Sequence, residues 1–247
     1  MAAGSYTRNY DDNSFVFFLE GWLIRHEQFL DELLVAQDTF DEETQEGVIR
    51  DLISRVLAHY QEYYEEKSKM SHRNVFHVFS PTWFTPLERT FLWITGFKPG
   101  LAFTLVTDSV NDLSENQVQR INRLRYETKV QEKSLADELA KIQESVAAPP
   151  LMEMARRVGM QLLHTDGTNI DIIDGDDNIE TLKSAMENLV TDADRLRTRT
   201  AERVVGVLSP LQSLRFLTAA AQLQLRLRMM GMQREAQRQP NEASNGW

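Results

Sequence analysis

Residues 75–99 read VFHVFSPTWFTPLERTFLWITGFKP, and this stretch decides how the rest of the chain is interpreted. It holds seven of the 22 aromatic residues (12 Phe, 6 Tyr, 4 Trp), namely Phe76, Phe79, Trp83, Phe84, Phe91, Trp93 and Phe97. Side chains of this kind at this density are either buried or form a docking surface. Pro81 and Pro86 disfavour helix at the residues before them, and Pro99 suits the first turn of a following helix. We predict a rigid aromatic corner with a short helix over residues 87–95, anchored by Trp83 and Trp93 folding back on the first two helices.

Apolar residues on both sides of the corner recur every three or four positions, the period of an amphipathic helix. The first face comprises Phe15, Phe18, Leu19, Trp22, His26, Phe29, Leu30 and Leu33, and the second comprises Val48, Leu52, Val56, Tyr60 and Tyr63. The same period continues over residues 118–146 and 179–205, and in the last helix it places Phe216, Ala220, Leu223, Leu227 and Met230 on one face. We therefore predict an all-α fold, a single multi-helix domain of about seven to eight helices.

Local signals set the boundaries. Ser114 followed three residues later by Gln117 is a capping box, and Ser209-Pro210 with Gln212 combines an N-cap, a proline at the first helical position and a capping glutamine. Residues 164–178, HTDGTNIDIIDGDDN, have no helical period and predict one acidic loop. With residues 1–14 and 232–247 as flexible tails, the predicted domain covers residues 15–231.

Composition excludes several classes of protein. There is no cysteine, so neither a disulfide nor a thiolate nucleophile is available. Phosphate-binding, dinucleotide-binding, serine-hydrolase and zinc-protease motifs are absent, so we expect no enzymatic activity. The apolar run at residues 15–24 is too short for a membrane span, which needs about 20 residues. The five histidines offer no third ligand near His72 and His77, while His26 and His59 lie beside apolar faces, so we expect structural roles and no metal site.

Several separated motifs resemble plant regulatory proteins. LAHY at residues 57–60, VFH at 75–77, Trp83 and then TPLER, FLW and GF between residues 85 and 97 resemble the C-terminal domain of TGA bZIP transcription factors. DLS at 112–114 with the residues that follow, and ADRLR at 193–197 running to VLSPLQ at 207–212, look closer to the DELAY OF GERMINATION proteins of seed dormancy, which share that domain.

The resemblance implies a non-enzymatic regulatory protein of the nucleus and cytoplasm, acting through protein–protein interaction in plant hormone, dormancy or developmental signalling. The implied partners are type 2C protein phosphatases or TGA-type factors. TGA factors carry a basic region ahead of this domain, whereas residues 1–14 contain one basic residue, Arg8, and the net charge is −10. We therefore expect no direct DNA binding and an indirect effect on transcription. One alternative is a nuclear transcription regulator that reaches DNA through TGA-type partners, and a second is a small-molecule or haem carrier.

The haem alternative depends on the last helix. The relatives that bind haem use two histidines four residues apart, on one face of that helix. The matching positions here hold Gln224 and Arg228, and neither is a usual iron ligand. We predict no haem through this site and no other cofactor.

Charge is unevenly distributed along the chain. Residues 27–66 hold twelve acidic residues and two arginines, whereas residues 192–238 hold nine arginines and four acidic residues. Arg195, Arg199 and Arg203 are spaced by four and form one stripe, flanked by Arg197. The stripe is either a solvated face partly paired with residues 27–66, or a docking site for an acidic partner or a second copy of the chain.

Overall fold

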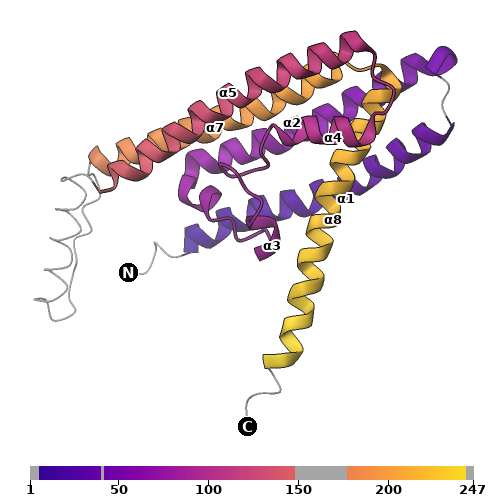
Figure 1. The fold of residues 1–247 in the computed structure, drawn as a ribbon. Helices are drawn as coiled ribbons and strands as arrows, with labels where there is room; N and C mark the ends of the chain where they lie inside the picture. The colour runs from indigo at the N-terminus through magenta and orange to yellow at the C-terminus, as the bar shows by residue number, and fades with distance from the viewer. Residues whose placement is uncertain (1–5, 40–41, 148–176, 243–247) are drawn as a thin grey trace, which may run out of the picture.

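The computed structural model describes residues 6–39, 42–147 and 177–242, which form seven helices (Figure 1). Their bounds are α1 Tyr6–Thr39, α2 Glu42–Phe79, α3 Pro86–Arg89, α4 Leu101–Ser109, α5 Glu115–Ser145, α7 Asp177–Val205 and α8 Pro210–Glu242. Within these residues the β structure is limited to one isolated bridge between Trp93 and Gly96. The predicted all-α fold is confirmed. None of the described helices combines the length and apolarity needed to cross a membrane.

The long helices form two pairs, and α2 of the first pair packs against the second. α1 lies along α2, α5 lies along α7, and α7 packs on α2 (Figure 1). α8 crosses the other elements and contacts α1, α2, α3 and α4 before its C-terminal end projects from the body. The aromatic corner occupies the connection between α2 and α4, where both α7 and α8 can reach it.

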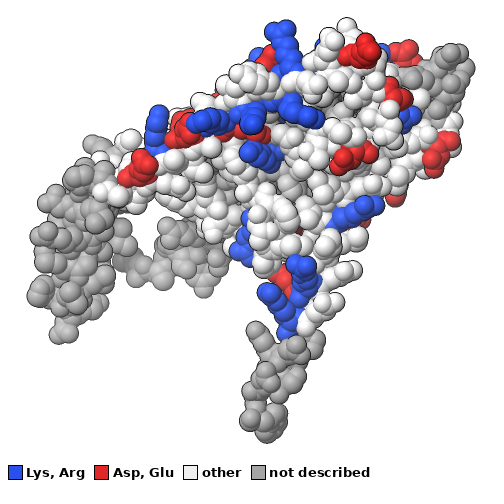
Figure 2. Space-filling view, in the orientation of Figure 1, with Lys and Arg blue, Asp and Glu red and all other residues white. Residues whose placement is uncertain are grey.

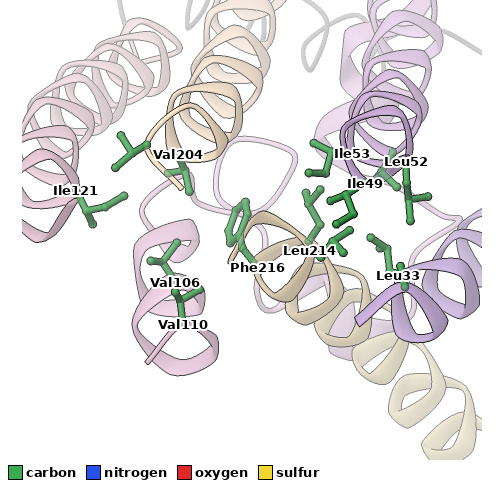
Figure 3. Packing of buried hydrophobic residues seen from close by; sticks show 14 of the residues in the cluster. Leu33, Ile49, Leu52, Ile53, Val106, Val110, Ile121, Val204, Leu214 and Phe216 are labelled. Carbon is green, nitrogen blue, oxygen red and sulfur yellow. The ribbon is translucent and has the colours of Figure 1, made fainter. Parts of the chain in front are cut away.

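The main core surrounds the first turns of α8. Leu214 and Phe216 lie between α1 and α2 on one side and α4 on the other (Figure 3). The same cluster of buried residues includes Leu33, Ile49, Leu52, Ile53, Val106, Val110, Ile121 and Val204. Burial of this apolar surface supplies the main drive for packing α8 across the helical pairs, at about 25 cal/mol for each Å² removed from water.

Two predicted capping boxes are confirmed, and they contact each other. Ser114 and Gln117 exchange hydrogen bonds at the start of α5, and Ser209 and Gln212 do the same at the start of α8. The amide of Gln117 then donates to Oε1 of Gln212 at 2.7 Å and to the carbonyl of Val207 at 3.0 Å. The caps therefore fix the starts of two helices relative to each other as well as ending each helix.

The structure corrects several helix predictions. The helix predicted over residues 87–95 ends at Arg89. The next N–H groups, of Thr90, Phe91 and Leu92, bond to carbonyls three residues earlier, and Ile94 and Thr95 have positive φ angles of 42° and 62°, which no right-handed helix can contain. Val48, placed on the buried face of the second helix, is 54% exposed, and its neighbour Ile49 is buried instead.

The predicted domain limits differ from the helix limits. Parts of both predicted tails, residues 1–14 and 232–247, are helical, since α1 begins at Tyr6 and α8 runs to Glu242. Each residue added to an existing helix gains a hydrogen bond without a new nucleation cost, so helices extend beyond their packed segments. The predicted acidic loop, residues 164–178, lies outside the described residues except for its last two positions, which begin α7.

Candidate functional site

The aromatic corner begins with a helix of four residues, α3, held by its own capping box. The hydroxyl of Thr85 accepts a hydrogen bond from the backbone N–H of Glu88 at 3.2 Å, and the Glu88 carboxylate accepts one from the Thr85 N–H at 2.7 Å. Pro86 occupies the first helical position, where its missing N–H costs nothing. This third box was not predicted, although TPLE fits the capping-box pattern.

The corner ends in a tight turn that other residues hold in place. Trp93 N–H donates to the carbonyl of Gly96 at 2.7 Å, and the return bond measures 3.3 Å. Ile94 and Thr95 between them adopt left-handed backbone angles, which are unfavourable for β-branched residues. Such a conformation persists where surrounding contacts enforce it.

Arg197 of α7 supplies those contacts. It is 6% exposed, and it donates hydrogen bonds to the carbonyls of Trp93, Ile94 (2.8 Å) and Phe97 (2.7 Å). Its guanidinium lies 5.5 Å from the centre of the Trp93 ring, and its Nη1 is 2.5 Å from Asp194 Oδ1. One buried side chain therefore holds both the backbone and an aromatic ring of the corner.

A second buried cation shares the Asp194 carboxylate. Lys67 of α2 is almost fully buried, and its Nζ lies 3.0 Å from Asp194 Oδ1. Burial lowers the pKa of Lys67 to about 8, while the nearby Asp194 carboxylate opposes that shift. Lys67, Asp194 and Arg197 thus link α2, α7 and the corner through one polar cluster.

The other side of the corner is held by α8. Arg228 Nη1 lies 3.4 Å from the Trp83 carbonyl and 3.5 Å from Glu88 Oε1. One turn further, Gly231 packs so closely against Thr85 that an added Cβ would lie 2.1 Å from the Thr85 hydroxyl oxygen. A glycine is required here for the close approach of α8 to α3.

The two tryptophans of the corner are partly buried, and they face different helices. Trp83 packs against Phe15 of α1, with ring centroids 4.8 Å apart, as expected. Trp93 packs in a cluster with Ile142 of α5 and Leu189 of α7, so the prediction that it folds back on the first two helices is wrong. Its ring instead covers the guanidinium that fixes the turn.

The predicted arginine stripe is divided among different environments. Figure 2 shows Lys and Arg side chains gathered over α5 and α7 on one face of the molecule. Arg195 pairs with Asp192 of its own helix at 2.7 Å, and Arg203 pairs with Glu127 of α5 at 2.8 Å. Arg199 is exposed between hollows on either side of α7.

These ion pairs differ from those expected if the stripe were a solvated face partly paired with residues 27–66. Neither Asp192 nor Glu127 belongs to the acidic residues 27–66, because Asp192 lies in α7 itself and Glu127 lies in α5, which runs along α7. Arg197, which the sequence placed only at the edge of the stripe, makes most of the structural contacts of the region. The missed signal was Asp194 three residues before it, a charged pair adjoining the apolar positions Ala193 and Leu196.

His26 and His59 are buried, as predicted, and both stack on Trp22. The ring centroids lie 4.6 Å and 4.3 Å from that of Trp22 and 5.4 Å from each other, so both imidazoles lie on the same face of the indole. Burial lowers the pKa of His26 to about 4, and burial together with His26 and Arg25 lowers that of His59 to about 3. Both rings are neutral packing groups at physiological pH.

The positions relevant to metal or haem do not converge. Among the described residues, no group of three or more His, Cys, Asp or Glu side chains could hold a metal ion. Gln224 lines a cavity between α2, α4, α7 and α8, whereas Arg228 contacts the aromatic corner. The two positions expected from the haem-binding relatives therefore face different surroundings.

The fold and site define an all-α domain in which arginines from two helices hold an aromatic corner. A family model described as seed dormancy control matches residues 29–108. Protein ZW2 of Arabidopsis thaliana is 39% identical over 89% of this chain and 96% of that protein. The Arabidopsis Protein RESPONSE TO ABA AND SALT 1 is 38% identical over 87% of the chain and 94% of its own length. The wheat (Triticum aestivum) transcription factor HBP-1b(c38) is 27% identical over 85% of the chain and 61% of its own length. The chain belongs to the DOG1 family of seed dormancy control.

Proposed function

We propose that this protein is a non-enzymatic regulator that acts through protein–protein interaction in plant hormone, dormancy or developmental signalling. Membership of the seed dormancy control family supports the regulatory role, and the name of one relative refers to abscisic acid and salt. Relatives named as transcription factors support a link to transcription. The effect on transcription is indirect, through partners that bind DNA, and the protein works in the nucleus and cytoplasm.

The observation that carries the proposal is an exposed methionine surface near the projecting end of α8. Met229, Met230 and Met232 are 57%, 47% and 54% exposed, with Met229 and Met232 on one side of α8 and Met230 on the other, and together they define the methionine surface around this turn of the helix. Water-exposed methionines at this density contribute little to the fold, whereas their flexible, polarisable side chains suit adaptable protein contacts. The helix beneath them is held by Gly231 and Arg228, so the surface is presented on a fixed element.

The partners proposed are a type 2C protein phosphatase or a TGA-type factor, with a second copy of this chain as a further candidate. Isothermal titration of the purified chain with each candidate tests the proposal. A partner that uses the methionine surface should bind the triple variant M229S/M230S/M232S at least about tenfold more weakly. The matched control replaces three exposed apolar residues of α5, V118S/Y126S/V130S, and should bind as the wild type does. If both variants bind the partner equally well, the methionine surface is not the binding site for that partner.

The arginine stripe is the second proposed docking element, and the structure refines its test. Arg203 pairs with Glu127 across α5 and α7, so reversing its charge would disturb the fold as well as any partner. The variant Arg195→Glu/Arg199→Glu leaves that pair intact. If the stripe docks an acidic partner, this variant loses binding at physiological salt, and normal association would leave the stripe as a solvated face.

The transcription-regulator alternative makes a different prediction about DNA. The chain alone should not bind a TGA-site duplex in a fluorescence anisotropy titration at moderate salt. Addition of a TGA factor should bring the chain into the complex if the link to transcription runs through that partner. Tight, sequence-selective binding by the chain alone would contradict the indirect role.

A further inference from the structure

A cavity of about 500 Å³ lies between α2, α4, α7 and α8, apart from the methionine surface. Phe216 and Leu217 of the main core form part of its lining and are buried. Ser54, Gln61 and Glu202 are exposed and also line it, so the cavity opens to solvent. It is therefore a cleft that a molecule from solution can enter.

The cavity exists because each of the four helices contributes an alanine to it. These residues are Ala58 of α2, Ala102 of α4, Ala201 of α7 and Ala220 of α8. Protein interiors are normally close-packed, and larger apolar side chains at these positions would fill the space between the helices. The lining also includes five leucines and four aromatic residues, so the walls offer apolar contact over most of their area.

The polar groups of the cavity favour an uncharged ligand. Arg197 uses its donors on backbone carbonyls and Asp194, and Lys98 Nζ lies 3.6 Å from the Glu132 carboxylate, so both cations of the lining already have partners.

We propose that this cavity binds an uncharged, largely apolar small molecule. Pockets for small molecules have volumes of about 300–1,000 Å³, a range that includes this cavity. The single acidic group of the lining, Glu202, further disfavours an anionic ligand. The site uses none of the residues of the methionine surface, so it stands independently of the proposed partner contacts.

Titration with prodan, an uncharged naphthalene fluorophore with one carbonyl acceptor, tests the proposal. The wild type should bind one prodan per chain with a blue-shifted emission. Ala58→Phe and Ala220→Leu fill the cavity from opposite walls and should weaken binding at least about tenfold.

Two controls separate the cavity from other apolar surfaces. The triple variant M229S/M230S/M232S should bind prodan as the wild type does, and the anionic probe 1-anilinonaphthalene-8-sulfonate should bind the wild type more weakly than prodan. Ala58 lies at the exposed mouth, so its variant should remain folded by circular dichroism even if Ala220→Leu does not. The proposal is wrong if the wild type binds no prodan, if a folded Ala58→Phe variant binds it normally, or if the anionic probe binds more tightly.

Discussion

Arg197 illustrates what single residues contribute to this fold and what the sequence reveals of them. Spacing along α7 predicted that Arg195, Arg199 and Arg203 share a stripe, and it assigned Arg197 no separate role. Arg197 is important because it donates hydrogen bonds to the carbonyls of Trp93 and Phe97, about 100 positions earlier in the chain. A local sequence pattern cannot predict a partner at that distance. Residue spacing predicts which side chains share a face, but long-range packing decides which of them are buried.

Arg197→Ala should therefore destabilise the protein by about 3–5 kcal/mol, because it leaves the buried carbonyls of the corner without their donors and opens a space beside the Trp93 ring. Arg197→Lys keeps the charge but not the planar set of donors, so its loss should be intermediate. Arg199→Ala is the matched control and should change stability by no more than about 0.5 kcal/mol. Urea unfolding followed by circular dichroism measures all three variants. Equal midpoints for the two alanine variants would contradict the conclusion that Arg197 holds the aromatic corner.

Gly231 gives a second prediction at the same scale. A methyl group here would lie 2.1 Å from the Thr85 hydroxyl oxygen, so Gly231→Ala should cost about 1–3 kcal/mol although alanine favours helix. Gly47, in α2 with nothing within 4 Å of an added Cβ, is the control, and Gly47→Ala should stabilise by up to about 1 kcal/mol. Thermal unfolding of both variants provides the comparison, and shifts of the same sign would contradict the close contact.

Among the elements, the sequence predicted helices with strong periods and caps well and predicted the corner only in outline. α5, α7 and α8 begin within a few residues of their predicted starts, because caps and apolar spacing are local signals. The corner was predicted as rigid, but its helix ends after four residues, and the turn that follows at Ile94 and Thr95 is held by Arg197 of α7. A β-branched residue at positive φ contradicts its local preference, so sequence reasoning extended the helix through it.

The joined capping boxes yield a prediction about helix starts. Ser209→Ala should cost about 1 kcal/mol, the usual value of an N-cap. Gln212→Ala should cost more, about 2–3 kcal/mol, because the Gln212 side chain also bonds Gln117 and donates to the Asp112 carbonyl at 3.0 Å in a buried setting. Gln119→Ala on the exposed face of α5 should have almost no effect. If the Gln212→Ala and Ser209→Ala variants have the same melting temperature, the two capping boxes stabilise their helices independently.

For the whole molecule, the sequence predicted an all-α domain and its family motifs but not the way the helices enclose space. The four alanines of the cavity lie on separate helices, so no sequence window brings them together, and α8 crosses the others at an orientation set by Leu214 and Phe216. The Trp22 stack was partly predictable. His26 and His59 lie on apolar faces, and their burial follows from the period, whereas their shared position on one indole face requires the packing of α1 on α2.

The same stack predicts how the whole fold responds to acid. The folded-state pKa values of His26 and His59, about 4 and about 3, lie below the ordinary value of about 6.5. At acidic pH the unfolded chain therefore binds protons at these histidines that the folded chain does not bind. The free energy of unfolding has its full value above pH 6.5 and falls as the pH decreases toward the folded-state pKa values. Between pH 7.5 and pH 5 each histidine should cost about 2 kcal/mol, about 4 kcal/mol together.

Urea midpoints measured from pH 7.5 to pH 4.5 should show this loss, with a shallower slope in His26→Gln because one titrating ring is gone. The other charged groups near His59 do not provide a buried counter-ion, since Glu62, 3.9 Å from its Nδ1, is exposed and already paired with Arg25 at 2.8 Å. His72 is exposed, so His72→Gln should keep the wild-type slope and serves as the control. A wild type whose stability stays constant down to pH 5 would mean that the imidazoles accept protons in place, and that the α1–α2 contact admits water to the face of Trp22.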